Sequence, residues 1–100
     1  MQLVTTPIPN STLKTIAEQG FGDLVKAVID ISKHSAVIDA DLHADEEQYL
    51  LSLGSQQSNL WGINIYPNLS GTNRIEFDSM INVRPQQKNF SRLVENASIR

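Results

Sequence analysis

The sequence predicts an α+β fold in which two N-terminal helices pack on one face of an antiparallel sheet of 3–5 strands, with a short C-terminal helix after the sheet. Apolar residues recur at helical spacing up to about residue 33, and they alternate with polar residues between 60 and 84. Turn-rich loops separate these runs. Because a chain of 100 residues can bury one hydrophobic core, we expect a single domain over residues 1–100.

The first third of the chain predicts one edge strand and two helices. Residues 3–6 are rich in β-branched side chains and precede two prolines, which is typical of a short edge strand. Asn10 and Ser11 can cap a first helix that Gly20 ends. A second helix is predicted over 21–32, where the apolar residues again follow helical spacing.

The segment after residue 35 changes to a period of two. If it is extended, one of its sides carries the acidic row with its histidine, namely Asp39, Asp41, His43 and Asp45. Residues 45–47 are either the turn out of this strand or the acidic first turn of a helix that runs to Leu53, and the pattern leaves both open. Residues 49–53 are a further candidate strand at an edge of the sheet.

The second half predicts a β-hairpin from 60–66 and 74–84, joined by a loop rich in proline, asparagine and glycine. Alternation turns Trp61, Ile63 and Ile65 inward, and the inward residues of the second run are Ile75, Phe77, Ser79, Ile81 and Val83. We expect this face to pack on the two helices. Ser91 can cap a short terminal helix that runs through residues 93–95.

Three motifs carry a resemblance to a known family. They are Leu42-His43-Ala44-Asp45-Glu46-Glu47, the run from Leu60 to Pro67, and the run from Ile75 to Pro85. They resemble a small family of uncharacterised bacterial proteins, largely cyanobacterial, that is classified only as a domain of unknown function. The resemblance runs from about residue 21 to residue 100, and it implies no activity, substrate or cofactor.

Composition excludes several classes of function. The absence of cysteine excludes disulfides, thiolate metal sites and a cysteine nucleophile. The net charge is −3, and the first half holds 3 basic and 8 acidic residues, which opposes nucleic-acid binding. The first residues show neither a basic segment nor a long apolar run, so we expect no signal peptide, no membrane helix and a cytoplasmic location.

The candidate catalytic residues are His43, Asp45, Glu46, Glu76 and Asp78. Carboxylates with one imidazole suit a divalent metal ion such as magnesium, manganese or zinc, which can activate water for hydrolysis. His43, Asp45, Glu76 and Asp78 are therefore also the candidate metal ligands, and a divalent metal is the cofactor to consider. The other interpretation is that these side chains form the solvated face of a sheet covered on one side only.

The candidate ligand-binding residues are Asn64, Tyr66, Asn82, Arg84 and Arg92. The two arginines lie around Pro85, near the predicted last helix, and could bind an anion. They could instead form ion pairs with Glu76 or Asp45, and Asn64 could belong to a cross-strand polar network. Gly62 within a strand indicates a bulge, a close approach by another part of the chain or a ligand contact.

The function that these observations favour is a binding or assembly module that acts as a homo-oligomer, expected to be a dimer, or as a partner protein. No phosphate-binding loop, dinucleotide fingerprint, paired-histidine zinc motif or serine elbow is present in the sequence. The alternative is a small metal-assisted hydrolase or nuclease-like enzyme that uses His43 with the nearby carboxylates.

Overall fold

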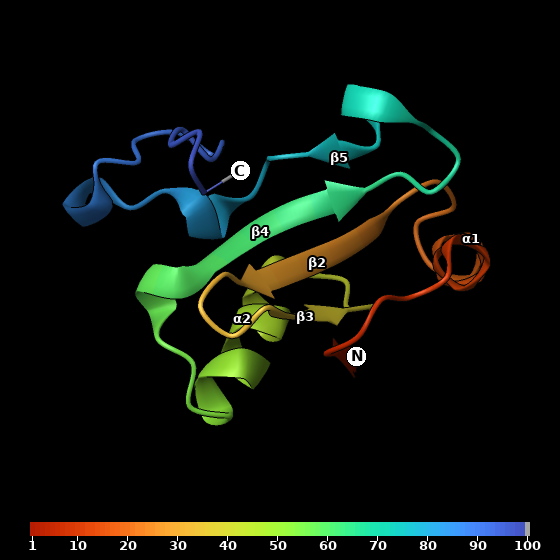
Figure 1. The fold of residues 1–100 in the computed structure, drawn as a ribbon, viewed down its shortest axis with the longest axis horizontal. Helices are drawn as coiled ribbons and strands as arrows, with labels where there is room; N and C mark the ends of the chain where they lie inside the picture. The colour runs from red at the N-terminus through yellow and green to blue at the C-terminus, as the bar shows by residue number, and fades with distance from the viewer. Residues whose placement is uncertain (100) are drawn as a thin grey trace.

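A computed structural model describes residues 1–99, which form one five-stranded antiparallel sheet with two α-helices (Figure 1). The strands are β1 (Gln2–Val4), β2 (Val25–Asp30), β3 (Ser35–Ile38), β4 (Leu60–Ile65) and β5 (Ile75–Glu76), in the spatial order β1-β3-β2-β4-β5. Helix α1 (Asn10–Gln19) lies between β1 and β2 in the chain, and α2 (His43–Ser52) lies between β3 and β4. No helix in residues 1–99 is both long enough and apolar enough to span a membrane.

The prediction that two N-terminal helices pack together on one face of the sheet is wrong, although the α+β class and the antiparallel sheet are confirmed. The first predicted helix is α1, but the second, predicted over 21–32, is the central strand β2. Val25, Ala27 and Val28 are all buried, because β2 is covered on both faces of the sheet. A strand buried on both faces has a nearly continuous apolar sequence, and helical spacing fits such a run equally well.

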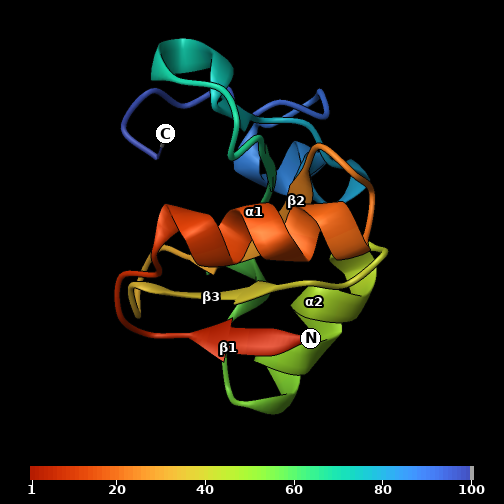
Figure 2. The same ribbon diagram turned by 90° about the vertical axis from the view of Figure 1, so that its right-hand side faces the viewer.

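The two helices cover opposite faces of the sheet. On one face, Ala27 of β2 belongs to a core cluster with Leu13 and Ala17 of α1. On the other face, Val28 belongs to a second cluster with Leu50 of α2. Figure 2 shows α1 crossing in front of β2, with α2 beside β3. The sheet is therefore the middle layer, because neighbouring side chains along a strand point to opposite faces.

The buried carboxylate of Asp30 holds the turn between β2 and β3. It accepts hydrogen bonds from the backbone N–H of Ser32 at 2.9 Å and of Lys33 at 3.0 Å, and from the Ser55 hydroxyl at 2.6 Å. Burial acts to raise the pKa of Asp30, but these hydrogen bonds lower it below its usual value. Asp30 therefore stays ionised, and it fixes the chain after α2 to the β2–β3 turn.

The acidic row does not lie along one strand, so that prediction is wrong. Strand β3 ends at Ile38, and Asp39 adopts a left-handed backbone with a φ of 66°. The alternative of an acidic first helical turn is right, because α2 begins at His43 and carries Asp45 and Glu46 in its first turn. Negative charge is favourable near a helix N-terminus. The candidate edge strand at 49–53 is therefore part of α2 and its C-cap.

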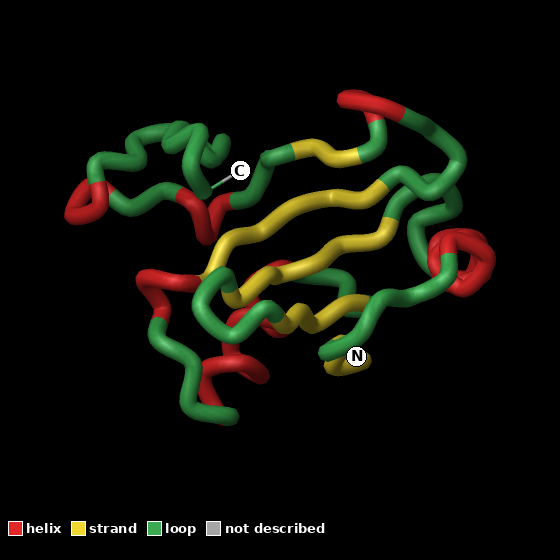
Figure 3. The backbone as a smooth tube through the Cα atoms, in the orientation of Figure 1, coloured by secondary structure: helices red, strands yellow, loops and turns green. Residues whose placement is uncertain are grey.

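Only the beginning of the predicted strand 74–84 is a strand. Asn64 pairs with Glu76 and Ile65 pairs with Ile75, which agrees with the predicted faces of the hairpin. The chain then continues in single 3-10 turns at 80–82 and 85–87, and the rest is loop (Figure 3). Ile81, predicted inward beside Trp61, instead packs on the cluster that contains Leu50.

The predicted C-terminal helix is also wrong, since residues 91–99 contain no helix. The Glu95 carboxylate accepts from the backbone N–H groups of Phe90 and Ser91, at 2.8 and 2.9 Å. The side chain of Asn89 donates to the carbonyls of Asn82 and Leu93, both at 2.6 Å. These side chains satisfy the backbone groups of the loop locally, which competes with helix formation.

Side chains take the place of a strand along the part of β4 that β5 does not reach. Asn82 Oδ1 accepts from the Gly62 N–H at 2.8 Å, and Asn82 Nδ2 donates to the Gly62 carbonyl at 3.0 Å. The carbonyl of Leu60, two residues before Gly62 in β4, accepts a hydrogen bond from Nη2 of Arg84. Gly62 thus marks a close approach, because a Cβ atom there would lie 2.6 Å from Cβ of Ser79.

We predict that Gly62→Ala destabilises the fold, by about 1–3 kcal/mol in denaturant unfolding, because Ser79 cannot withdraw without moving the 79–82 turn. Gly20→Ala is the matched control. The atom nearest to a Cβ at Gly20 would be the carbonyl oxygen of Ile16, at 3.4 Å. Equal stability of Gly62→Ala and wild type would contradict the close packing of these two segments.

Candidate functional site

His43 begins α2 and lies against β4. Its Nε2 is 2.7 Å from the carbonyl oxygen of Ile63, and because a carbonyl only accepts, Nε2 carries the hydrogen. Burial lowers the pKa of His43, as do the charges of Lys26 and Arg92, while this hydrogen bond and the charge of Asp78 raise it. The net direction is downward, so the imidazole is neutral at pH 7 and Nδ1 is an acceptor.

Glu46 lies one turn further along α2 and is fully buried. Its Oε2 accepts a hydrogen bond from the backbone N–H of Ala40 at 3.2 Å. Its Oε1 is buried without a hydrogen-bond partner among the described residues. Burial raises the pKa of Glu46 to about 9, against smaller opposing effects of the Ala40 N–H and the charge of Lys26. Glu46 is therefore a neutral carboxylic acid at pH 7.

His43 and Glu46 combine a neutral imidazole with a protonated acid three residues apart on one helix, so they share one side of α2. A general acid and a general base require such shifted protonation states. However, His43 is 7% exposed and Glu46 is 0% exposed. Both side chains therefore face the interior of the protein and not the solvent.

A second polar group lies across β4 and β5, as one of the sequence interpretations suggested. Asn64 Nδ2 donates to Glu76 Oε1 at 2.8 Å and to the Asp78 carbonyl at 3.4 Å. The Tyr66 hydroxyl donates to the same Glu76 oxygen at 3.3 Å. Asp78 forms a 2.7 Å ion pair with Arg92 on the surface. Three candidate ligand-binding residues are thus engaged with two candidate catalytic carboxylates.

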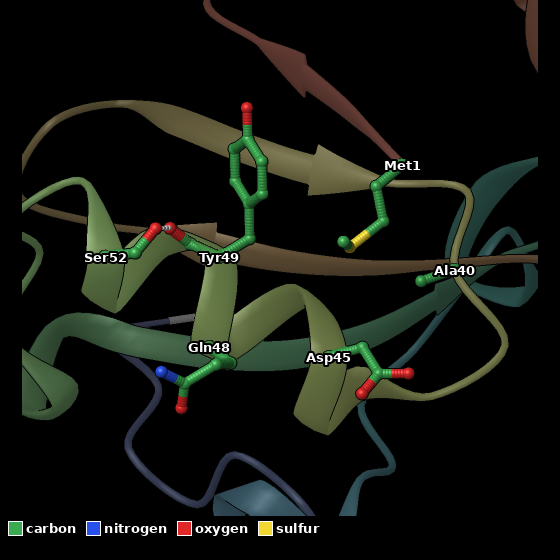
Figure 4. A pocket seen from close by; sticks show the side chains of 6 residues that line it. All are labelled: Met1, Ala40, Asp45, Gln48, Tyr49 and Ser52. Carbon is green, nitrogen blue, oxygen red and sulfur yellow. Dashed lines mark hydrogen bonds between the residues drawn. The ribbon is translucent and has the colours of Figure 1, made fainter.

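Asp45 does not join these groups. It is exposed on the outer side of α2, where it lines a shallow hollow beside Met1 and Tyr49 (Figure 4). Over residues 1–99, no group of three or more histidine, aspartate or glutamate side chains is arranged to hold a metal ion. The proposed set of four metal ligands therefore comes from separate places: the first turn of α2, strand β5 and the loop after it.

Asn82 and Arg84 serve the structure of the sheet edge. Both are buried, and the guanidinium of Arg84 donates to the carbonyls of Ile81 at 3.0 Å and Gln57 at 2.7 Å, besides that of Leu60. The same group lies 4.6 Å from the centre of the Trp61 ring. Its ion-pair partner is Glu47 at 3.7 Å, so the suggested pairing with Glu76 or Asp45 is wrong for Arg84.

An apolar surface that the sequence patterns did not predict lies next to β1. Met1, Leu3 and Tyr49 are 59%, 41% and 39% exposed, and Met1 and Tyr49 line the same hollow (Figure 4). Leu3 lies on the same strand face as Met1 because the two are two residues apart. We call Met1, Leu3 and Tyr49 the β1/α2 surface. The feature of the sequence that indicates this surface is a first strand that is uncharged and partly apolar.

Comparison with family models shows that the chain belongs to the family described as "Protein of unknown function (DUF5674)", whose model matches residues 2–100. No curated protein and no solved structure matches the chain. The match thus confirms the resemblance to a domain of unknown function, and it covers residues 2–100.

We predict that Glu46→Gln removes a pH dependence of stability. The pKa of Glu46 is about 9 in the folded chain and near 4.5 in the unfolded chain, so the folded state binds one more proton between these values. The stabilisation is full below about pH 4.5 and is lost as the pH rises toward 9. Relative to the variant, wild type should lose on the order of 1 kcal/mol per pH unit in denaturant unfolding. The effect of His43 is common to both proteins and cancels in the difference. If the free energies of unfolding of wild type and variant followed parallel curves from pH 5 to 9, a protonated Glu46 would be contradicted.

We further predict that Arg84→Lys lowers the free energy of unfolding by on the order of 2–4 kcal/mol. The single nitrogen of a lysine cannot reach the three carbonyls that Nε, Nη1 and Nη2 of Arg84 contact. Arg92→Lys is the matched control, since that side chain is 55% exposed and its single ion pair can re-form. The measurement is denaturant unfolding of both variants at pH 7. Similar losses in the two proteins would argue against a structural role for Arg84.

Proposed function

We propose that this chain is an assembly module that forms a homodimer through the open edge of β1. The observation that carries the proposal is the position of β1 at the end of the sheet, where its outer side pairs with no strand of residues 1–99. The exposed side chains of the β1/α2 surface lie next to this edge. An unpaired edge beside exposed apolar side chains is typical of a site where another strand adds.

The partner we propose is a second copy of the chain. Two copies of β1 can pair antiparallel about a two-fold axis, which closes the assembly at two subunits. The first ten residues contain no charged side chain, so no like charges oppose each other across such an axis. The paired strands would bring Leu3 of both copies onto one face, beside the two copies of Tyr49.

The opposite edge of the sheet offers less for self-association. β5 is only two residues long, and one of them, Glu76, would place a charge opposite its symmetry mate. Edges are commonly protected from pairing by shortness and by charge. The difference between the two edges supports β1 as the assembly edge.

The alternative, a metal-assisted hydrolase that uses His43 with nearby carboxylates, has less support. The observation in its favour is that the negative charge of Asp78 acts on His43 and raises the pKa of the imidazole. Asp45, however, lies on the outer side of α2. Calorimetry with manganese, magnesium and zinc tests this alternative: binding that His43→Ala abolishes without unfolding the chain would favour it over assembly.

We predict that wild type sediments as a dimer at micromolar concentration and that Leu3→Lys weakens the dimer by at least about tenfold. The new charges would face each other near the symmetry axis and would have to leave water. The measurement is sedimentation equilibrium over a range of concentrations. Because Leu3 is 41% exposed, we expect the monomer to keep its stability.

Leu69→Lys is the matched control, since Leu69 is 47% exposed in the loop between β4 and β5 and is not part of the β1/α2 surface. It should dimerise as wild type does. A strictly monomeric wild type at high micromolar concentration, or an equal effect of the two lysine variants, would refute assembly through β1.

A further inference from the structure

We propose that the first turn of α2 is a pH-dependent switch, which is closed while the side chain of Glu46 is neutral and opens, with the sheet intact, when Glu46 loses its proton. The part that moves is residues 39–46, which we call the α2 entry segment. It connects the end of β3 to the first turn of α2. The inference does not rest on assembly through β1, and it concerns a local opening at a lower cost than global unfolding.

The α2 entry segment is held to the rest of the protein by polar side chains and not by an apolar core. Within residues 39–49, the buried side chains are those of His43 and Glu46, and the next buried residue along α2 is Leu50. Leu42, the one large apolar side chain of the segment, is 57% exposed. A segment with few buried apolar contacts opens at a lower cost in free energy than the core of the same protein.

The backbone at the start of α2 adds little to this attachment. The N-cap is Leu42, whose side chain makes no capping hydrogen bond to the described part of the chain. Asp39, at the other end of the segment, has a φ of 66°, which lies in the left-handed region that residues other than glycine rarely adopt. Opening therefore breaks no side-chain cap and lets Asp39 leave the left-handed region.

Glu46 makes the closed form depend on a proton. Its side chain is fully buried, and its one hydrogen bond comes from the N–H of Ala40, which belongs to the same segment. Among residues 1–99 no ion pair includes Glu46. A buried carboxylate without a counter-ion is strongly unfavourable, so the ionised form of Glu46 is stable only where water reaches it.

The charges that face Glu46 from the other elements do not compensate for its burial. Lys26 of β2 and the amino group of Met1 favour the ionised form, whereas Asp39 in the loop after β3 opposes it. The favourable charges have less effect than burial, which raises the pKa of Glu46 to about 9. The closed segment therefore holds its proton well above the pH at which an exposed glutamate loses it.

Opening returns the carboxyl group to water, where its pKa is near 4.5 instead of about 9. Between these two values, each pH unit favours the open form over the closed form by a further factor of about ten. The segment opens once this gain exceeds the cost of releasing its few contacts. Opening therefore begins below the pH at which Glu46 would ionise in the closed segment.

The opening changes the surface beside β1. Ala40 and Asp45 belong to the α2 entry segment, and they line the same hollow as Met1 and Tyr49 (Figure 4). When the segment opens, the β1/α2 surface loses this neighbouring wall. His43 also leaves the carbonyl that it binds on β4 and reaches water. The protonated form of Glu46 is thus the form that keeps this side of the molecule closed.

Alanine methyl groups can follow the opening in ¹H–¹³C correlation spectra from pH 5 to 10, because their hydrogens do not exchange with water. Ala40 and Ala44 report on the α2 entry segment, and Ala27 in β2 is the reference. We expect the Ala40 and Ala44 signals to move to unfolded-chain positions with a midpoint below about pH 9, while Ala27 stays in place. Movement of all three together would show global unfolding and overturn the proposal. Ala40 and Ala44 signals that stay in place up to pH 10 would also overturn it, whether or not the carboxyl carbon of Glu46 titrates.

Two variants assign the transition to Glu46. Glu46→Gln keeps the shape of the neutral side chain and cannot ionise, so its Ala40 and Ala44 signals should stay at the closed positions up to pH 10. Asp45→Asn is the matched control, because it removes one exposed carboxylate from the same helical turn. Its midpoint should stay within about one pH unit of the wild-type midpoint. A Glu46→Gln variant that opens with the wild-type midpoint, or an Asp45→Asn variant without the transition, would overturn the role of Glu46.

Discussion

Along part of the edge of β4, side chains instead of a strand satisfy the backbone N–H and C=O groups. The rest of the structure depends on this constraint. β5 pairs only with Asn64 and Ile65, so the edge of β4 from 60 to 62 needs other partners. Asn82 and Arg84 bind the backbone of Gly62 and Leu60 there. Because side chains can reach a strand from several directions, the chain after β5 is free to leave the sheet. It passes Ile81 to the α2 face and brings Val94 to the α1 face.

The elements that the sequence predicts correctly are those with one clear period and clear end signals. Helix α1 ends before Gly20 as predicted, and β4 spans the run predicted from Trp61, Ile63 and Ile65. The predicted cap at Asn10 or Ser11 is wrong, because both residues lie within the helix and Pro9 is its N-cap. β2 was mistaken for a helix because burial on both faces removes the alternation that marks a strand. The rest of the predicted strand after β5 could not be foreseen as loop, since the hydrogen bonds that Asn82 and Asn89 offer it depend on tertiary contacts.

The candidate site could be predicted in part. The sequence brought Glu76, Asp78 and Asn64 together correctly, because strand alternation places paired residues on the same face. It could not separate Asp45 from Glu46, since which of two adjacent carboxylates is buried depends on the direction in which α2 packs on the sheet. That direction makes Glu46 a neutral acid with a pKa of about 9 and leaves Asp45 on the surface. Burial, and not residue type, thus decides which acidic group has unusual chemistry.

The order of the strands keeps the two edges of the sheet apart and yet joins them mechanically. β1 and β5 lie at opposite ends of the order β1-β3-β2-β4-β5, so a dimer at β1 leaves the β4–β5 end uncovered. Both nevertheless depend on β2, which pairs with β3 on one side and with β4 on the other. β2 is buried on both faces, and a close-packed strand in that position resists sliding. A dimer at β1 can therefore influence the β4–β5 end only through a shift of the sheet as a whole, which makes an unchanged β4–β5 end the outcome that this architecture favours.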